Sequence, residues 1–504
     1  MGTLTNGETM DSHSEIGEDD KLREYCGVIG VYLSDHEPIA ARLGYYGLQS
    51  LQHRGQESTG LAVADGEKVE HFREMGLVSE VYNKENIAAL RGHIAIGHVL
   101  YSTSGKATIE NAQPFVSRSR LGTIAIAHNG SLVNTEPMKE FLEETGSTFT
   151  SSSDTEVIIK LIAKNYKKGL ERALTDTIQL IKGSFALVVM TEKTLIGARD
   201  PNGIRPLCLG KLQNGWVLAS ESCAIDAMGG DLVRDIAPGE IVIINDDGVL
   251  SFNFGEKTAK KTCIFEYVYF ARPDSIIDGI GVLEARHKMG EVLARESGVA
   301  ADVVIGVPDS GLGAAMGYSK ASGIPYAMGI VKNKYIGRTF IAPSQEEREA
   351  MVFVKLNALK SDVAGKRVVI IDDSIVRGTT SRRLIQILRK AGAREVHFRI
   401  SSPPVKFPCY FGIDTPARAE LISAQHEIDE IRDAIGADSL AFISMEGMID
   451  ALQSCEWEED TRQGKERNGK AEKSHGDGAT NCGYCQGCFL GEYPMPMIGE
   501  LGKR

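Results

Sequence analysis

Residues 368–380 constrain the fold of this chain more than any other segment. A short apolar run that begins at Val368 is followed by two aspartates, a Gly-Thr-Thr turn and a helical pattern. Comparable β-branched runs stand at residues 303–307 and 396–400. Strands that alternate with helices are typical of a parallel α/β sheet. We therefore predict such a domain over residues 256–455.

The first half of the chain, residues 26–255, has a different pattern. Apolar runs at residues 123–127 and 186–190 predict buried strands. Helical spacing predicts one helix over about residues 38–52 and a second that begins at Ser153, where a glutamate three residues later gives the spacing of a capping box. We expect a layered domain of sheet and helix, so the predicted fold class is α/β and α+β, multidomain.

The two ends of the chain differ from both halves. Residues 1–25 are polar and acidic and lack the apolar period of a helix or a strand, so we expect a pro-segment there. Residues 456–480 are charged and carry almost no apolar side chains, which predicts a mobile loop. That loop leads into a cysteine-rich tail at residues 481–504.

The composition argues against several classes of function. The formal net charge of −12 at pH 7 disfavours non-specific binding to nucleic acid or to a membrane surface. No apolar run reaches the ~18 residues of a membrane span. Residues 1–25, the head of the chain, lack the basic and apolar regions of a secretory signal. Nine cysteines in a chain of this length favour reactive or metal-bound thiols over a disulfide framework. We expect a cytoplasmic protein.

Cys26 is the first candidate for chemistry. If the head is removed, its thiol stands beside a free α-amine, whose pKa of roughly 7.7–8.0 suits a general base near neutral pH. A nucleophile that uses its own N-terminus as base is an established catalytic arrangement. The alternative interpretation is a small buried residue at the start of a strand.

The segment after Val368 is the second candidate. Its Gly378-Thr379-Thr380 turn offers backbone N–H groups and hydroxyls at a helix N-terminus, which suits a phosphate dianion. Asp372 and Asp373 end the strand and would take ribose hydroxyls, directly or through Mg²⁺. The alternative is that these residues only cap a helix.

This segment resembles the phosphoribosyl-diphosphate loop of type I phosphoribosyltransferases. The resemblance implies that 5-phosphoribosyl 1-diphosphate is bound by the loop, Ser374 included, and that pyrophosphate is displaced at the anomeric carbon. It also suggests that Ser310, after the preceding strand, holds Mg²⁺ or pyrophosphate. The cationic stretch from Lys332 to Arg338 would close over the diphosphate. As a charge run alone, that stretch is more often typical of a solvated face.

The chain as a whole resembles the glutamine phosphoribosylpyrophosphate amidotransferases, in particular the iron–sulfur branch with an N-terminal pro-segment. This implies an N-terminal-nucleophile glutaminase of αββα layers, followed by a type I phosphoribosyltransferase domain. The catalytic residues implied are Cys26, Arg54 of a His-Arg-Gly-Gln segment, and Asn129 and Gly130 of an oxyanion hole. The implied glutamine-binding residues are Tyr101, Thr103 and Asp154.

The same resemblance implies the reaction and its partners. Glutamine would acylate Cys26 and release ammonia, which would pass through an interior channel and give 5-phosphoribosylamine. This is the first committed step of de novo purine (IMP) biosynthesis. Family members are inhibited by purine nucleotides and are usually homotetramers. A hexosamine-forming amidotransferase shares the first half, and a regulator that binds phosphoribosyl diphosphate without catalysis is the alternative of another class.

One residue departs from the family pattern. The family has an arginine that binds the glutamine α-carboxylate in a Gly-His-x-Arg-Tyr segment, whereas this chain has Leu100. Leucine donates no hydrogen bond. We expect weakened use of glutamine with synthesis from free ammonia intact, unless another cation such as Arg91 compensates.

The tail contains a third candidate site. A pair such as Cys485-x-x-Cys488 binds zinc, an iron–sulfur cluster or nothing. The family resemblance adds Cys263 and Cys409 and implies a [4Fe–4S] cluster held by the four thiolates, with a structural or oxygen-sensing role. Cys482 is a near neighbour that would be easily mistaken for a ligand. Zinc stays open as the alternative metal.

Overall fold

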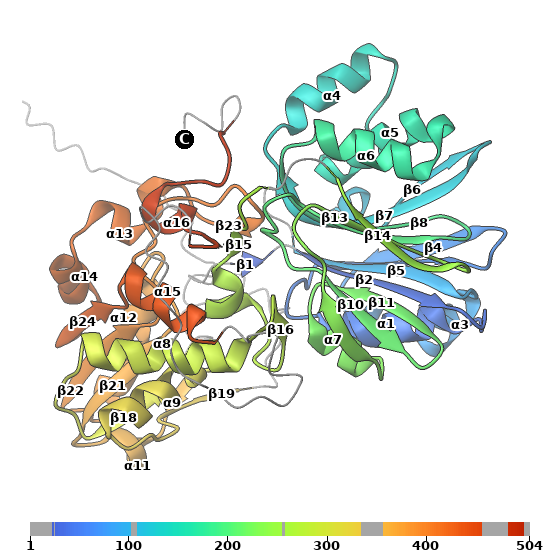
Figure 1. The fold of residues 1–504 in the computed structure, drawn as a ribbon. Coiled ribbons are helices and arrows are strands. Elements are labelled where there is room, and N and C mark those ends of the chain that lie inside the picture. The colour runs from blue at the N-terminus through green and yellow to red at the C-terminus, as the bar shows by residue number, and fades with distance from the viewer. Residues whose placement is uncertain are drawn as a thin grey trace, which may run out of the picture.

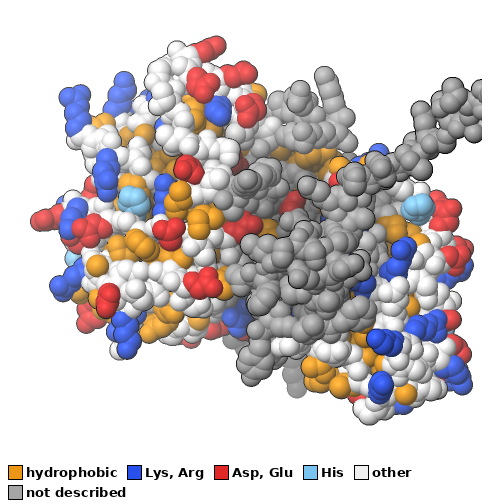
Figure 2. Space-filling model, turned by 180° about the vertical axis from the view of Figure 1, so that it is seen from behind, with side chains coloured by type: hydrophobic (Ala, Val, Ile, Leu, Met, Phe, Trp, Pro, Cys, Tyr) orange, Lys and Arg blue, Asp and Glu red, His pale blue; other side chains and the backbone are white. Residues whose placement is uncertain are grey.

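The computed structural model describes residues 23–24, 26–101, 108–254, 258–333, 356–455 and 482–497. Figure 1 shows a two-layered sheet structure in the first half (blue to green) beside a second half (yellow to red) built around another sheet. Acidic and basic side chains of the described residues are interspersed on the face shown in Figure 2. None of the described helices combines the length and the hydropathy needed to cross a membrane.

Two sheets form the first half. The order of the seven-stranded sheet is β12 (Asp231–Asp235), β10 (Cys208–Leu212), β11 (Gly215–Ala219), β2 (Cys26–Leu33), β5 (Ile94–Leu100), β3 (Ser58–Ala64) and β4 (Val69–Met75). The order of the six-stranded sheet is β14 (Gly248–Asn253), β13 (Glu240–Asn245), β9 (Leu195–Arg199), β8 (Gly183–Met190), β7 (Gly122–Leu132) and β6 (Phe115–Ser119).

The two sheets pack face to face, and helices cover their outer faces (Figure 1). A core of small and branched side chains, including Val28, Ala127 and Val188, fills the space between them. The outer helices are α1 (Ala40–Ser50), α2 (Val78–Val81), α3 (Lys84–Ala89) and α7 (Ser222–Ala227) on the first sheet, and α4 (Thr135–Glu144), α5 (Asp154–Asn165) and α6 (Leu170–Leu180) on the second. The predicted αββα arrangement is therefore present.

The start of α5 corrects one sequence prediction. Ser153 caps this helix, because its hydroxyl accepts a hydrogen bond from the Thr155 N–H at 3.3 Å. The Glu156 carboxylate does not complete a capping box. It accepts hydrogen bonds from the N–H groups of Thr150 and Ser151 instead, at 3.1 and 2.8 Å. These donors outcompete the Ser153 N–H for the carboxylate, so the sequence pattern predicted the cap but not the box.

A parallel four-stranded sheet forms the centre of the second half, as the sequence predicts. Its order is β18 (Val303–Gly306), β21 (Arg367–Asp372), β22 (Glu395–Ile400) and β24 (Ser439–Phe442). The helices around it are α8 (Val282–Glu296), α9 (Gly311–Ser322), α11 (Lys360–Val363), α12 (Thr379–Lys390), α13 (Ile422–Gln425), α14 (Ile428–Ile435) and α15 (Met445–Gln453). All four strands run in one direction, so their carboxyl ends share one edge of the sheet.

Two short strand pairs attach the head and the tail to the second half, and two more lie within that half. Among the strand pairs are β1 (Arg23–Glu24) with β23 (Ile413–Asp414), β15 (Thr262–Cys263) with β25 (Tyr484–Cys485), β16 (Ile276–Ile277) with β17 (Ile280–Gly281), and β19 (Ile330–Lys332) with β20 (Leu356–Ala358). The remaining turns of helix are η1 (Ile109–Asn111), η2 (Tyr166–Lys168), the π-helical η3 (Glu266–Phe270), η4 (Arg418–Glu420) and α16 (Gly487–Leu490). The β1–β23 pair places the end of the head against the second half.

Candidate active site

A cavity of about 850 Å³ lies between the two halves. The first half contributes Cys26, Leu100 and the neighbourhood of His128. The second half contributes residues 408–410, which include Cys409, and the run from Gly412 to Ala419. The predicted loop from Asp372 to Thr380 is not part of its lining. The structure thus separates the residues predicted to bind glutamine from those predicted to bind phosphoribosyl diphosphate.

Cys26 is the first residue of β2, and its side chain is almost fully buried, with 4% exposed. The end of α1 packs against this strand, since a Cβ on Gly27 would come within 3.1 Å of the Leu51 Cβ. The turn that follows Leu51 carries Arg54. The predicted nucleophile and the predicted arginine therefore lie close together, where the end of α1 packs on β2.

Asn129 lies within β7, not in a loop, and is fully buried. Strand residues alternate between two faces, so Asn129 faces the space between the sheets together with Ala127. Cys26 shares the corresponding face of β2 with Val28. Neither the oxygen nor the nitrogen of the Asn129 amide has a hydrogen-bond partner among the described residues. A buried amide without a partner is the expected state of a donor that awaits an oxyanion.

Gly130 lines the cavity, and only glycine suits its position. Its φ of 146° lies where side chains are disfavoured, and a Cβ would collide with the Ser184 carbonyl oxygen. The backbone at the predicted oxyanion hole can therefore approach a ligand closely.

Asp154 opens α5 and borders the same cavity. Its carboxylate accepts a hydrogen bond from the Leu132 N–H at 2.9 Å and lies 3.5 Å from Nδ1 of His128. Burial alone would raise the pKa of Asp154, but His128 and the hydrogen bonds outweigh burial and lower this pKa. An ionised carboxylate in a cavity suits an ammonium group of a substrate. Tyr101 also lines the cavity, whereas Thr103 lies outside the described residues.

Leu100 is the cross-strand partner of Cys26 in the pairing of β2 with β5. It lines the cavity, so the departure from the family pattern falls next to the nucleophile. Arg91 precedes the opposite end of β5 and is too far away to compensate, since a strand rises about 3.3 Å per residue. Arg418 is the only lysine or arginine among the described lining residues. Its guanidinium carbon lies 4.5 Å from the centroid of the Phe407 ring.

The second group of predicted residues lies at the carboxyl edge of the parallel sheet. Asp372 ends β21, and both Asp372 and Asp373 are 1% exposed. The Asp373 carboxylate accepts hydrogen bonds from the hydroxyls of Ser374, at 2.6 Å, and of Ser310. The structure therefore brings together the four oxygen-bearing residues that the sequence assigned to Mg²⁺ and ribose.

The Gly-Thr-Thr turn has the predicted geometry. Gly378 precedes α12 with a φ of 81°, and Thr379 and Thr380 form the first turn of that helix. Lys332 ends β19 and donates to Asp309 at 2.7 Å, next to Ser310. Arg338 lies outside the described residues. The helix N-terminus and the two acids thus lie together in the form expected for a phosphate and ribose site.

The four predicted cysteine ligands converge on one region. Cys263 and Cys485 are register partners in the parallel pair of β15 and β25. Cys488 lies in α16, and its carbonyl accepts hydrogen bonds from Lys406 and Phe407, just before Cys409. Burial raises the pKa of Cys263, Cys409, Cys485 and Cys488, and the neighbouring thiols raise that of Cys488 further.

Four thiol side chains are a donor set that suits either a [4Fe–4S] cluster or a single zinc ion. In the described part of the chain, no group of three or more His, Cys, Asp or Glu side chains is placed to hold one metal ion. A [4Fe–4S] cluster binds each thiolate to a different iron, so its ligands lie farther apart than those of zinc. Cys482 instead accepts a hydrogen bond from the Gln486 amide at 2.5 Å.

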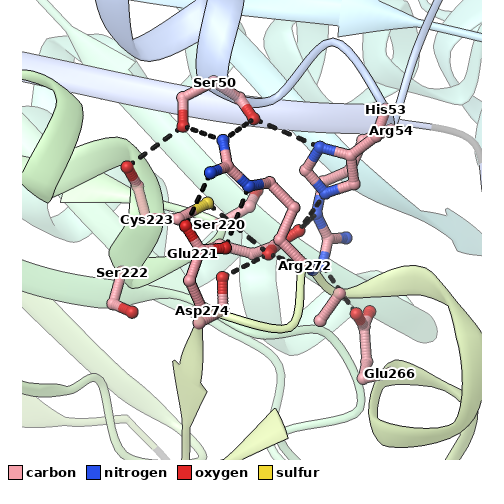
Figure 3. A network of polar contacts seen from close by, with 12 residues as sticks. Ser50, His53, Arg54, Ser220, Glu221, Ser222, Cys223, Glu266, Arg272 and Asp274 are labelled. Carbon is pink, nitrogen blue, oxygen red and sulfur yellow. Dashed lines mark hydrogen bonds and ion pairs between the residues drawn. The ribbon is translucent and has the colours of Figure 1, made fainter. Parts of the chain in front are cut away.

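Sequence reasoning missed a buried ion network at the boundary of the two halves (Figure 3). Its carboxylates are Glu221 and Glu266, which have no exposed side-chain surface. The available signal was a charged residue inside the apolar run 264–270. A sequence does not show whether such a carboxylate forms a buried ion pair. The position of this glutamate alone therefore predicted no role for it.

Models of two protein families match this chain. A glutamine amidotransferase domain matches residues 102–227, and a phosphoribosyl transferase domain matches residues 282–401. The amidophosphoribosyltransferase of Archaeoglobus fulgidus is 49% identical over 477 residues, which cover 94% of this chain and 99% of the relative. That of Bacillus subtilis is 47% identical over 480 residues, which cover 95% of this chain and 96% of the relative.

Solved structures agree with these relatives. A structure described as the allosteric regulatory enzyme of purine biosynthesis superposes with a TM-score of 0.86 at 47% identity, covering 94% of this chain and 97% of the other. The B. subtilis glutamine phosphoribosylpyrophosphate amidotransferase, complexed with ADP and GMP, gives a TM-score of 0.84 at 47% identity and covers 94% and 98%. The predicted fold class is confirmed, and a phosphoribosyl transferase domain excludes the hexosamine-forming alternative. The chain belongs to the amidophosphoribosyltransferase family.

Proposed function

We propose that this amidophosphoribosyltransferase divides its reaction between the cavity at Cys26 and the loop that begins at Asp372. The enzyme makes 5-phosphoribosylamine from 5-phosphoribosyl 1-diphosphate, glutamine and water, and releases glutamate and pyrophosphate. It thereby catalyses the first committed step of de novo purine biosynthesis. The observation that carries the two-site proposal is a cavity with Cys26 and Asp154 on one wall and residues of the second half on the other.

At the first site, the Cys26 thiol attacks the glutamine carboxamide. The C–N bond breaks, ammonia leaves with the proton that the thiol gave up through its own α-amine, and a thioester forms. Asn129 and Gly130 donate hydrogen bonds to the oxyanion. Arg54 fixes the position of the turn that packs beside Cys26. Asp154, Tyr101 and Thr103 bind the amino-acid end of glutamine. Water then hydrolyses the thioester and releases glutamate.

At the second site, ammonia displaces pyrophosphate from the anomeric carbon. We propose that Gly378, Thr379 and Thr380 bind the 5-phosphate and that Asp372, Asp373 and Ser374 bind the ribose, while Lys332 and Arg338 contact the diphosphate. The oxygen donors of Ser310, Asp372 and Asp373 suit Mg²⁺, which when bound would neutralise charge on the diphosphate. Ammonia would reach this site through an interior channel, because in water it would be protonated and lost.

The activity is tested by the release of pyrophosphate from 5-phosphoribosyl 1-diphosphate, with glutamine or with ammonium as the nitrogen source. Both sources are expected to give 5-phosphoribosylamine. A non-catalytic regulator would bind the same substrate without releasing pyrophosphate from either nitrogen source, and that result would overturn the proposal.

Leu100→Arg is expected to raise kcat/KM for glutamine about 10- to 150-fold. The reason is that an arginine donates hydrogen bonds to the α-carboxylate, and a hydrogen bond to a charged group contributes about 1.5–3 kcal/mol. Steady-state kinetics with glutamine and with ammonium measure the change, and the ammonium reaction should stay the same. Leu100→Met keeps the apolar bulk and serves as the control. An equal kcat/KM for glutamine in the natural chain and in Leu100→Arg would contradict the expectation. Arg418 would then be the candidate cation for the glutamine α-carboxylate.

For the tail, we propose a [4Fe–4S] cluster on Cys263, Cys409, Cys485 and Cys488 with a structural role. The support is the convergence of four thiols, two buried and two half-buried, from three separate segments. Purified protein is expected to contain about four iron and four sulfide per chain and to show a brown absorbance. Cys482→Ser is the matched control and should keep the iron content. Stoichiometric zinc without sulfide would establish the alternative metal.

We further propose the domain plan and assembly that the family resemblance implies. The segments are a pro-segment at residues 1–25, a glutaminase domain at 26–255, a phosphoribosyltransferase domain at 256–455, a mobile loop at 456–480 and a tail at 481–504. The loop lies outside the described residues. Inhibition by purine nucleotides is supported by the B. subtilis relative that was solved with ADP and GMP. We also propose a cytoplasmic homotetramer.

A further inference from the structure

A network of buried ion pairs crosses the boundary between the two halves (Figure 3). Arg54 of the first half is at its centre, and its guanidinium donates to two carboxylates. One is Glu221, contacted by Nε, and the other is Glu266, 2.6 Å from Nη2. All three side chains are fully buried. Arg54 is therefore fixed by one carboxylate from each half of the molecule.

Each carboxylate is held by further donors. Glu221 also accepts hydrogen bonds from Nε2 of His53 at 2.6 Å, from the Arg272 N–H at 2.9 Å and from the Ser275 hydroxyl at 2.5 Å. Burial would raise the pKa of Glu221, but Arg54, His53 and the hydrogen bonds hold it well below its usual range. The charge of Glu221 is therefore retained, and Arg54 keeps an ionised partner in the first half.

Glu266 has a different set of neighbours. It is the first residue of η3, and its other oxygen accepts a hydrogen bond from Nη1 of Arg205 at 2.9 Å. Arg205 in turn donates to the carbonyls of Phe411 and Gly412, and Gly412 lines the cavity. Glu266 thus links Arg54 to the cavity wall contributed by the second half.

The π-helical turn that carries Glu266 is itself anchored. Arg286 of α8 donates to the carbonyls of Tyr267, Tyr269 and Ala271 at 2.9, 3.1 and 2.8 Å. Its guanidinium is buried and is attracted by Asp373 of the phosphoribosyl loop. Arg286 of the second half therefore anchors the backbone of the turn that carries Glu266.

At its other end the network reaches the nucleophile. The residue after Arg54 is Gly55, where a Cβ would come within 2.6 Å of the Leu100 N atom, so the turn lies directly on β5. The Glu57 N–H donates to the Leu100 carbonyl at 2.9 Å. Leu100 is the register partner of Cys26. A shift of Arg54 would therefore be passed to the strand that flanks Cys26.

We propose that Glu266 is a positioning residue of the glutamine reaction, which acts on Cys26 through Arg54. The proposal rests on the proposed role of Cys26 as the nucleophile. Glu266 is not one of the residues that line the cavity, so we assign it an orienting role through Arg54 and no role in binding substrate. Because η3 belongs to the second half, the glutaminase site is complete only when the two halves are docked.

The test compares Glu266→Gln with the natural enzyme. The kcat of glutamine hydrolysis is expected to fall about 10-fold or more, which is the loss of one charge-assisted hydrogen bond to Arg54. The KM for glutamine and the rate of synthesis from ammonium should change less than about 3-fold. Glu266→Asp keeps the charge but shortens the reach by one methylene, and it should also lower kcat. This second variant keeps the test valid if Glu266→Gln fails to fold.

Asp278→Asn is the matched control. Asp278 of the second half pairs with the fully buried Arg199 of the first half at 2.7 Å, so it crosses the same boundary but does not contact Arg54. This variant should lose thermal stability to a similar extent while its ratio of glutamine to ammonium activity stays unchanged. If Glu266→Gln and Asp278→Asn lower both activities equally, Glu266 has only a structural role and the proposal is wrong.

A parallel Cys26→Ala variant separates this inference from the proposed function. If Cys26→Ala retains glutamine hydrolysis, the nucleophile assignment itself fails. If Cys26 is required but kcat is normal in both Glu266 variants, only the positioning role fails. The set is repeated in a Leu100→Arg background, so that weak glutamine use does not mask a change.

Discussion

Cys26→Ala is expected to abolish synthesis from glutamine and to leave synthesis from ammonium intact. Without the thiol no thioester forms, and loss of a catalytic nucleophile lowers kcat by at least about 10⁴-fold. The ammonium reaction needs only the second site, whose residues lie at the carboxyl edge of β21, outside the lining of the Cys26 cavity. Pyrophosphate release with each nitrogen source, measured side by side, gives the comparison.

Cys208→Ala is the control for this result. Cys208 is also a buried cysteine of the first half, with 2% exposed, but it lies in β10 away from the cavity lining. It should keep both activities. Mass spectrometry of the active enzyme should find Cys26 as the N-terminal residue, since the α-amine is the proposed base. Glutamine-dependent activity in Cys26→Ala, or full activity with residues 1–25 still attached, would refute the assignment.

Asp372→Asn combined with Asp373→Asn is expected to lower synthesis from both nitrogen sources by roughly 10²-fold or more. Each substitution replaces a charged acceptor by a neutral amide, and each lost charge-assisted hydrogen bond costs about 1.5–3 kcal/mol. Loss of the two carboxylates would also weaken Mg²⁺ binding. Titration of 5-phosphoribosyl 1-diphosphate at several Mg²⁺ concentrations, by pyrophosphate release, measures the effect.

The control is an acid at the other edge of the same sheet. Asp302 directly precedes β18 and pairs at 2.8 Å with Arg367, the first residue of β21. Asp302→Asn should leave synthesis near that of the natural enzyme. Thermal unfolding of the double variant shows whether the fold is kept, because Asp373 also holds the hydroxyls of Ser310 and Ser374. If the folded double variant has normal activity, Asp372 and Asp373 do not bind the substrate.

Local patterns predicted much of the fold. The run 368–380 forms strand, turn and helix within consecutive residues, so its geometry depends on contacts that a sequence displays directly. The cap at Ser153 was predicted for the same reason. The capping box was wrong because Glu156 found donors at Thr150 and Ser151 upstream of the helix, a competition that the four-residue pattern does not contain.

The candidate site was predicted only in part. Family resemblance, not spacing, suggested Asn129 and Asp154, and their catalytic roles stay predictions. The cavity wall from Gly412 to Ala419 carries no motif and was not predicted. Glu221 and Glu266 were missed too, because a carboxylate in a sequence is usually solvated, and its burial depends on cations that are distant in the chain.

The sequence by itself determined the two-half plan, the nucleophile candidate, the phosphate loop and the departure at Leu100, because each depends on neighbouring residues or on a family motif. Only the tertiary structure decided that Leu100 stands opposite Cys26, that four cysteines converge, and that Arg54 is bound by a carboxylate from each half. Strand register and domain docking set these contacts, and they arise from the burial of apolar surface over the whole chain.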